Sequence, residues 1–230
     1  CADRSPTAWP VACCRTLVKG SRMEASAVDL SVDRLETLLE DGEFVLYRSA
    51  ANTTPARSML VMPRSEHPRP QAVRMLEHEH SLRDELDPAW AIRSRALTTH
   101  RGRAALVLED PGGELLVRRV GTPMDVGDAM RVGAGLATAL RQLHGRGLIH
   151  KDIKPTNIIV GCSDGDVRLT GFGIASRLSR ERQAPEPPET IAGTLAYMAP
   201  EQTGRMNRSV DSRSDLYALG VTFYEMLTGR

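Results

Sequence analysis

The sequence predicts an α+β fold in two lobes, a small lobe rich in strands followed by a lobe rich in helices. In the first half, short apolar runs at 44–47 and 59–62 are separated by turn residues, which is typical of strands. In the second half, apolar residues recur at helical spacing over long stretches. A chain of 230 residues with 41% hydrophobic residues is long enough to bury the core of such a fold.

Composition and charge exclude several classes of protein. A net charge of +1 gives no reason to expect nucleic acid as a partner. The sequence has no apolar run of about 18 residues, so we expect no membrane span. The four cysteines, which lack the spacing of a metal site, are Cys1, Cys13, Cys14 and Cys162. We therefore expect reduced thiols and a cytoplasmic protein.

The chain divides into a leader and two lobes. Residues 1–22 show no apolar period, and we expect a linker or a non-native leader there. We expect residues 32–110 to form the first lobe and residues 111–230 the second. Because the sequence stops directly after a helical pattern, we expect the second lobe to be incomplete.

The first lobe is expected to contain a hairpin, further strands and one helix. Asp-Gly at 41–42 between apolar runs predicts a hairpin over 32–48. A strand follows at 59–62, and another runs through 103–109. Between them, the helical period and a first-turn proline predict a helix over 70–86, which Pro88 would stop.

The second lobe is expected to rest on two helices. Thr122 as N-cap, Pro123 at the first position and Asp125 at the third predict the start of a helix that ends at Gly145–Gly147. Strands are expected at 158–161 and 167–170. The second helix is expected to begin with Ser214 and Asp215 as its cap and to end at 229.

The most informative stretch is 150–157, which reads His-Lys-Asp-Ile-Lys-Pro-Thr-Asn between apolar neighbours. Phosphoryl transfer needs a carboxylate that holds the attacking hydroxyl, a cation near the moving phosphate and a metal ligand. Asp152, Lys154 and Asn157 have the residue types and spacing for these three roles. The alternative is an ordinary polar loop between a helix and a strand.

This stretch resembles the catalytic loop of Ser/Thr protein kinases. Residues 193–201, which read Gly-Thr-Leu-Ala-Tyr-Met-Ala-Pro-Glu, closely match a second kinase motif. The resemblance runs from about Leu35 to Arg230 and is strongest from His150 onward. It implies a two-lobed kinase-like fold, ATP and Mg²⁺ as cofactors, and a protein substrate or a regulated signalling domain as partner.

The resemblance implies a role for each matching residue. Asp152 would be the base, Lys154 the cation near the phosphate and Asn157 a metal ligand. Thr194 would bridge Asp152 and Lys154. His150 would pack beneath the site, and Asp215 would bind the backbone of the loop.

Nucleotide-binding residues are implied mainly by position. The backbone of Glu109 and Asp110 would meet the adenine edge, with the next amide donor at Gly112 because Pro111 has none. Gly42 is the one glycine left of the loop that covers the phosphates in kinases.

Two departures from the kinase pattern stand out. The strand at 59–62 has Met62 or Pro63 at the place of the phosphate-binding lysine, so that Arg57 or Arg64 would have to supply a cation. The metal-binding aspartate is replaced by Gly171. Without the lysine, Glu79 of the predicted helix is either the inward glutamate of kinases or a solvated charge.

Segments 169–177 and 201–208 are similar to a narrower group, the kinase-like domains at the N-terminus of large bacterial signalling proteins. That similarity implies an ATPase module and a sensor histidine kinase further along the chain. The segment 174–198 resembles an activation segment, with Thr190 as a residue that could be phosphorylated.

Three functions are open at this point. The first is an ATP-dependent Ser/Thr protein kinase. The second is a pseudokinase, which would use the same fold as a regulatory or docking module without transferring phosphate. The third, phosphorylation of a small molecule, is disfavoured by the motif at 193–201.

Overall fold

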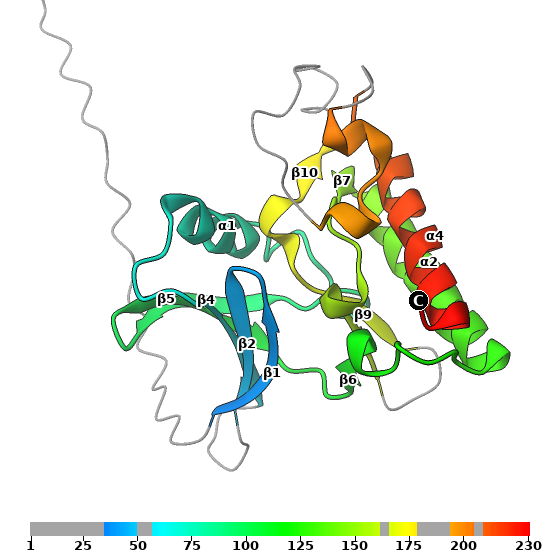
Figure 1. The fold of residues 1–230 in the computed structure, drawn as a ribbon. Helices are drawn as coiled ribbons and strands as arrows, with labels where there is room; N and C mark the ends of the chain where they lie inside the picture. The colour runs from blue at the N-terminus through cyan, green and yellow to red at the C-terminus, as the bar shows by residue number, and fades with distance from the viewer. Residues whose placement is uncertain (1–34, 50–56, 162–165, 179–193, 205–208) are drawn as a thin grey trace, which may run out of the picture.

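The computed structural model describes residues 35–49, 57–161, 166–178, 194–204 and 209–230. Two lobes lie side by side, one built on a sheet with helix α1 above it and one built around helices α2 and α4 (Figure 1). The predicted α+β architecture in two lobes is confirmed. Predictions for residues 1–22, for Cys162 and for Thr190 concern parts of the chain outside the described residues.

The sheet of the first lobe has five antiparallel strands in the order β1-β2-β3-β5-β4. Four of the strands match predicted strands, whereas β4 was not predicted because its alternation is interrupted by Arg, Thr and His. The strands are β1 (Leu35–Asp41), β2 (Phe44–Ser49), β3 (Ser58–Pro63), β4 (Ser94–His100) and β5 (Arg103–Glu109).

The hairpin between β1 and β2 turns where the sequence predicts it. Asp41 pairs with Phe44, so the turn consists of Gly42 and Glu43. Gly42 has a φ of 55°, a left-handed conformation that glycine adopts without the cost a side chain would bring. The hairpin therefore projects a tight tip from the edge of the sheet.

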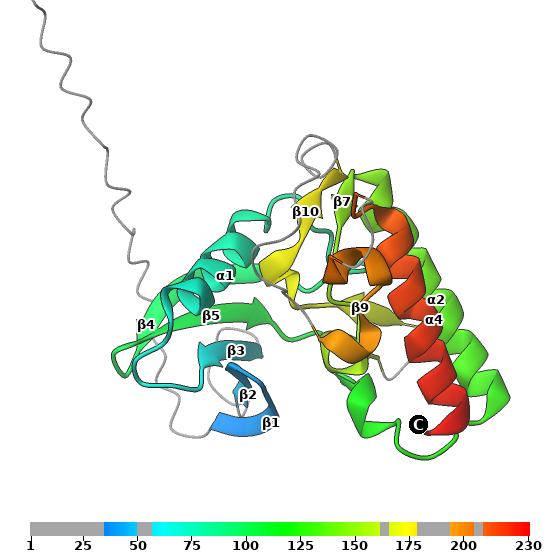
Figure 2. The ribbon, with the colours of Figure 1, turned by 45° about the horizontal axis from the view of Figure 1, so that its top comes forward.

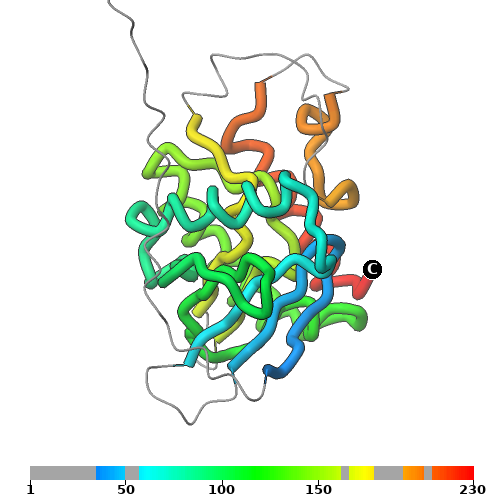
Figure 3. The backbone as a smooth tube through the Cα atoms, turned by 90° about the vertical axis from the view of Figure 1, so that its left-hand side faces the viewer, coloured from blue at the N-terminus to red at the C-terminus, as the bar shows by residue number. Residues whose placement is uncertain are grey.

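Helix α1 (Pro70–Ser81) begins at the predicted proline but ends five residues before the predicted Leu86. At its C-cap, the N–H of Leu82 donates to the carbonyl oxygen of Glu79. Leu82, Leu86 and Trp90 are buried in the core of the second lobe, which draws the chain away from the helix axis. Figure 3 looks onto the sheet lobe with α1 crossing it.

Helices α2 (Val126–Gly145) and α4 (Ser212–Thr228) lie against each other along most of their length (Figure 2). Gly133 allows the close approach, because a Cβ there would come 2.9 Å from the ring of Phe223. Both helices begin at other residues than predicted. Asp125 caps α2 by accepting from the N–H groups of Gly127 and Asp128.

The predicted start of α2 at Thr122 is wrong because the preceding chain is held by α4: the N–H of Met124 donates to the carbonyl oxygen of Met226 at 2.8 Å. The predicted cap of α4 at Ser214–Asp215 is also wrong. Asp211 is its N-cap, and Asp215 lies one turn inside the helix with its side chain buried.

Short strands connect these helices to the loops between the lobes. One sheet has the order β6-β8-β9, and β7 pairs with β10. Their bounds are β6 (Glu114–Leu115), β7 (Leu148–Ile149), β8 (Ile158–Val160), β9 (Val167–Leu169) and β10 (Ser176–Arg177). In the part of the chain that the structure describes, no helix is both long and apolar enough to cross a membrane.

Candidate active site

A cleft of about 400 Å³ opens between the tip of the β1–β2 hairpin, helix α1 and the loop that follows β7. Its walls carry both acidic and basic groups. Those used below are Asp41, Arg69, Glu79, Lys154, Asn157 and Thr194. Asp152 also lines it, so the predicted catalytic loop faces the open space between the lobes.

Asp152 is held on both of its carboxylate oxygens. The Asn157 Nδ2 amide donates to its Oδ2 at 2.9 Å and also to its backbone carbonyl oxygen at 2.8 Å. The backbone N–H of Thr194 donates to its Oδ1 at 3.1 Å. These donors fix the direction of the carboxylate, and Oδ1 keeps a lone pair for a hydroxyl in the cleft.

Lys154 places a cation next to this carboxylate. Its ammonium lies 3.3 Å from the Asp152 carboxylate and donates to the Thr194 hydroxyl at 2.7 Å. Lys154 is buried, so solvent screens its charge less than it would at the surface. The structure thus brings together Asp152, Lys154, Asn157 and Thr194 in one network, with Thr194 between Asp152 and Lys154 as the resemblance implies.

Asp215 of α4 anchors the loop from below. Its two carboxylate oxygens accept the backbone N–H groups of His150 and Lys151 at 2.9 and 2.8 Å. The same carboxylate lies 2.8 Å from Nε2 of His144. Asp215 is completely buried, so these charge-assisted bonds act where water does not compete. The predicted binding of Asp215 to the loop backbone is confirmed.

His150 supports the site without facing the cleft. Burial lowers the pKa of His150 below its ordinary value, against the opposing influence of Asp215 and Asp152. The neutral ring donates from Nε2 to the carbonyl oxygen of Thr170 at 3.0 Å and accepts the Asp152 N–H on Nδ1 at 3.3 Å. Its ring also packs against Phe172. The predicted packing beneath the site is confirmed.

Gly171 lies directly against Asn157. It has a φ of 80°, and a Cβ built on it would come 2.8 Å from the Asn157 carboxamide. A side chain at this position would therefore be strained and would have to displace Asn157. Gly171→Asp would therefore add a carboxylate and also shift Asn157.

Glu79 points inward. Its side chain is buried, and Oε1 accepts the backbone N–H of Gly171 at 3.3 Å. Burial raises the pKa of Glu79 to about 7, although backbone hydrogen bonds from Phe172 and Gly171 oppose the rise. Of the two interpretations of Glu79, the structure supports the inward glutamate and excludes the solvated charge.

The sequence predicts Met62 or Pro63 at the place of the phosphate-binding lysine. The residue of β3 that faces the cleft is Val61, so this prediction is wrong. Val61 pairs with Leu46 of β2, and both side chains line the cleft. Met62 is buried on the opposite face of the sheet, because neighbouring residues of a strand point to opposite sides. The apolar Val61 therefore occupies the place of the phosphate-binding lysine.

The sequence suggests Arg57 or Arg64 as the source of a cation. Neither lines the cleft, and Arg64 lies 3.5 Å from Glu40 at the surface. Arg69, which sequence reasoning missed, does line the cleft and lies 2.9 Å from Glu43 of the hairpin tip. Its position just before α1 carries no motif that could have identified it.

Asp41 is the second residue that sequence reasoning missed. From the hairpin tip its Oδ2 accepts from the Lys154 ammonium at 2.7 Å and from the Thr156 hydroxyl at 3.2 Å. The hairpin thus carries a carboxylate onto the catalytic loop. Gly42 beside it also lines the cleft, as its predicted place over the site requires.

Comparison with known proteins agrees with this geometry. The family model of the protein kinase domain matches residues 61–230. This chain belongs to the protein kinase domain family.

Among its relatives are three bacterial proteins. Serine/threonine-protein kinase Pkn1 of Myxococcus xanthus is 41% identical over 131 residues, which cover 56% of this chain and 18% of the relative. Probable serine/threonine-protein kinase PknB of Bifidobacterium longum is 38% identical over 127 residues, or 54% of this chain and 18% of the relative. Serine/threonine-protein kinase PknL of Mycobacterium tuberculosis is 29% identical over 218 residues, or 86% of this chain and 52% of the relative. The chain spans about half of the last relative and less of the others.

The link between the lobes of this kinase domain differs from the prediction in one respect. The expected donor N–H groups already have acceptors within the chain. That of Asp110 donates to the carbonyl oxygen of Arg57 at 3.3 Å, and that of Gly112 donates to the Asp110 carboxylate at 3.0 Å. The N–H of Glu109 donates to the carbonyl oxygen of Arg93.

Glu201 of the second kinase motif has a partner in the described part of the domain. Ser214 donates its hydroxyl to the Glu201 carboxylate at 2.7 Å. Next to it, Gln202 donates from Nε2 to the carbonyl oxygen of Lys151 at 2.8 Å. The segment after Thr194 is thereby joined to the catalytic loop.

Proposed function

We propose that this domain transfers a phosphoryl group from ATP to serine or threonine hydroxyls of a protein, as part of a signalling protein. The observation that carries the proposal is the network in which Asn157, Lys154 and Thr194 hold the Asp152 carboxylate. A donor with a terminal phosphate is supported by the cleft, where Lys154, Arg69 and Thr156 supply cations and a hydroxyl.

Asp152 acts as the base in this proposal. A substrate hydroxyl would donate to one of its carboxylate oxygens, which orients the hydroxyl oxygen towards the phosphorus atom. As the new O–P bond forms, the hydroxyl proton passes to Asp152, and the bond between the phosphorus and the leaving oxygen of the donor breaks. Lys154, whose ammonium lies 3.3 Å from the Asp152 carboxylate, would balance the negative charge on the transferred group.

A Mg²⁺ ion fits this cleft incompletely. Asn157 is the one predicted metal ligand that lines it, and Gly171 offers no carboxylate beside it. Within the described ranges no group of three or more His, Cys, Asp or Glu side chains could hold a metal ion. No step of the proposed transfer is therefore assigned to a metal.

The partners follow from the reaction. We propose a protein substrate or a regulated signalling domain, and further domains C-terminal to residue 230 in the longer protein. ATP as the donor favours the cytoplasm. The proposed lobes remain 32–110 and 111–230. The predicted contacts of Glu109 and Asp110 with the nucleotide base are not part of the proposal, because the N–H groups of both residues already have acceptors within the chain.

The test is transfer of labelled phosphate from ATP to the protein itself and to a mixed protein substrate, with the wild type and with Asp152→Asn. We expect the variant to lose transfer by about 100-fold or more, because it removes the base. Its melting temperature should stay close to that of the wild type. Asp128→Asn on the surface of α2 is the matched control and should keep full transfer. Equal turnover of both variants would exclude Asp152 as the base.

A pseudokinase is the second candidate. It is favoured by Val61 and Gly171, which remove a cation and a carboxylate from the cleft, and by the Asp41 carboxylate on Lys154. Calorimetry of ATP with Mg²⁺ and with chelator separates the candidates. Binding together with loss of transfer in Asp152→Asn supports the kinase, whereas binding without any transfer by the wild type supports the regulatory module.

A further inference from the structure

The lining of the cleft does not extend to the link between the lobes. Its lining comes from the hairpin tip, β2, β3, α1, the catalytic loop, segment 170–173 and Thr194. No residue of 103–115, a stretch that the structure describes completely, takes part in the lining. This cleft therefore stops short of the link between the lobes.

An apolar cluster fills the space between the open cleft and that link. Leu46 and Leu76 belong to both the cleft wall and the cluster. Behind them, Met59 of β3 and Leu108 of β5 are completely buried, and Ile159 of β8 joins them from the second lobe. Side chains from the two lobes thus pack against each other where a flat base could otherwise lie.

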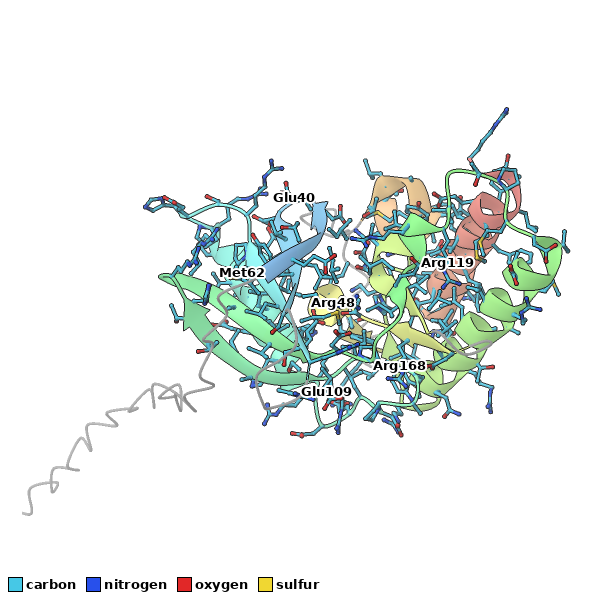
Figure 4. All side chains as sticks on the ribbon, turned by 90° about the horizontal axis from the view of Figure 1, so that it is seen from below. Glu40, Arg48, Met62, Glu109, Arg119 and Arg168 are labelled. Carbon is cyan, nitrogen blue, oxygen red and sulfur yellow. The ribbon has the colours of Figure 1, made fainter. Side chains whose placement is uncertain are left out.

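The polar edge beyond this cluster is also closed. Arg48 of β2 reaches across to Asp110, with Nε 2.9 Å from one carboxylate oxygen and Nη2 donating to the other at 3.1 Å. Nη2 also donates to the carbonyl oxygen of Gly113 at 3.2 Å. The Asp110 side chain is 1% exposed, so this paired contact is shielded from water. Figure 4 shows Arg48 between the sheet lobe and the helical lobe.

The link between the lobes offers few free hydrogen-bond donors to a nucleotide base. The N–H groups of Glu109, Asp110 and Gly112 are engaged within the chain, and Pro111 has none. Reading a base by hydrogen bonds would require these bonds to break, which leaves buried groups unpaired. In contrast, Lys154, Thr156 and Arg69 line the cleft with groups suited to phosphate.

We infer that this cleft recognises its phosphoryl donor by the polyphosphate chain and not by the base, and that Met59 is the residue that excludes the base. The inference rests on the proposed function, because it takes a phosphoryl donor as the ligand. Met59 is the residue that excludes the base because it shares the cleft-facing side of β3 with Val61 and lies deeper between the lobes.

The experiment is calorimetric titration of the wild type with ATP, GTP and tripolyphosphate at one Mg²⁺ concentration. We expect dissociation constants that agree within about threefold, since a base that stays outside the cleft adds little affinity. ATP that binds at least about tenfold more tightly than both GTP and tripolyphosphate would overturn the inference while leaving the proposed function intact.

Met59→Ala tests the residue, with Met62→Ala as its matched control. Both methionines are buried in β3, but Met62 lies on the face away from the cleft. Met59→Ala should raise the preference for ATP over tripolyphosphate by about threefold or more, because truncation opens space for the base. Met62→Ala should leave that preference unchanged at a similar loss in melting temperature.

Other results of these titrations would contradict the role of Met59 or the inference as a whole. An unchanged preference in Met59→Ala, or an equal shift in Met62→Ala, would remove Met59 as the determinant. If none of the three compounds binds the wild type or Met59→Ala, both the inference and the proposed transfer fail. That outcome differs from selective ATP binding, which contradicts the inference alone.

Discussion

Glu79 is an acidic side chain that is buried in the fold. It contacts backbone N–H groups at Gly171 and Phe172, and no cationic side chain pairs with it in the described ranges. Burial raises its pKa from 4.5 to about 7. Since the unfolded chain leaves this carboxyl in water, the folded state binds its proton more tightly than the unfolded state does.

This difference predicts a pH dependence of stability. Between pH of about 4.5 and 7 the folded state holds more protons, so the free energy of unfolding should fall as pH rises, by roughly 3 kcal/mol in total. Glu79→Gln cannot ionise and should remove this fall. Urea unfolding at pH 4.5 and pH 8 measures it.

Glu77→Gln, at an exposed position of the same helix, is the control and should keep the pH dependence of the wild type. Glu79→Gln should be close to the wild type at pH 4.5 and more stable than it at pH 8. Parallel pH profiles of Glu79→Gln and the wild type would contradict the raised pKa.

Asp152, Lys154 and Asn157 could be predicted as a group from the sequence because they lie at fixed offsets in one loop. Val61 could not be predicted as the cleft-facing residue of β3, since a shift of one residue along a strand exchanges its two faces. Asp41 could not either, because its contact with Lys154 joins residues 113 apart and depends on how the hairpin leans over the loop.

Helix α4 contacts the catalytic loop through Asp215. Asp215 accepts from His150 and Lys151, so Asp215→Ala would leave buried donors unpaired. We expect a loss of about 3–5 kcal/mol in the free energy of unfolding, measured with urea. Asp211→Ala removes the half-buried N-cap of the same helix and should cost about 1 kcal/mol. Similar losses in the two variants would contradict the anchoring role of Asp215.

The β1–β2 hairpin competes with a ligand for Lys154. Asp41→Asn removes the charge of the carboxylate that accepts from the Lys154 ammonium. We expect tripolyphosphate to bind about fivefold more tightly, which corresponds to roughly 1 kcal/mol for a partly exposed ion pair. Calorimetry measures the change.

Glu40→Gln is the matched control, because Glu40 lies on the same hairpin and faces Arg64 at the surface. It should leave the affinity within about twofold of the wild type. Weaker binding by Asp41→Asn would mean that Asp41 assists the ligand and does not compete with it.

Helix boundaries were the least predictable part of the elements. Capping residues at 122–125 suit two different starts, and the hydrogen bond from Met124 to Met226 selects the later one. The end of α1 is likewise decided by the burial of Leu82 in the other lobe. Both outcomes depend on contacts between elements, which local patterns do not contain.

At the scale of the whole molecule, the two lobes share an apolar cluster. Met59 of the sheet lobe and Ile159 of the helical lobe are both buried in it. We expect the lobes to open together, so amide hydrogen exchange near β3 and β8 should report the same opening free energy as urea rises. Opening of the sheet at a clearly lower free energy than that of α2 would show independent lobes.

The anchoring of the catalytic loop by α4 also bears on how the protein is made. The N–H groups of His150 and Lys151 lie 65 and 64 residues before the carboxylate that accepts them. The ribosome therefore completes the loop well before it adds Asp215, and the loop lacks this carboxylate acceptor during that interval. Its final geometry depends on a segment that is translated late, which keeps an unfinished chain from presenting an ordered site.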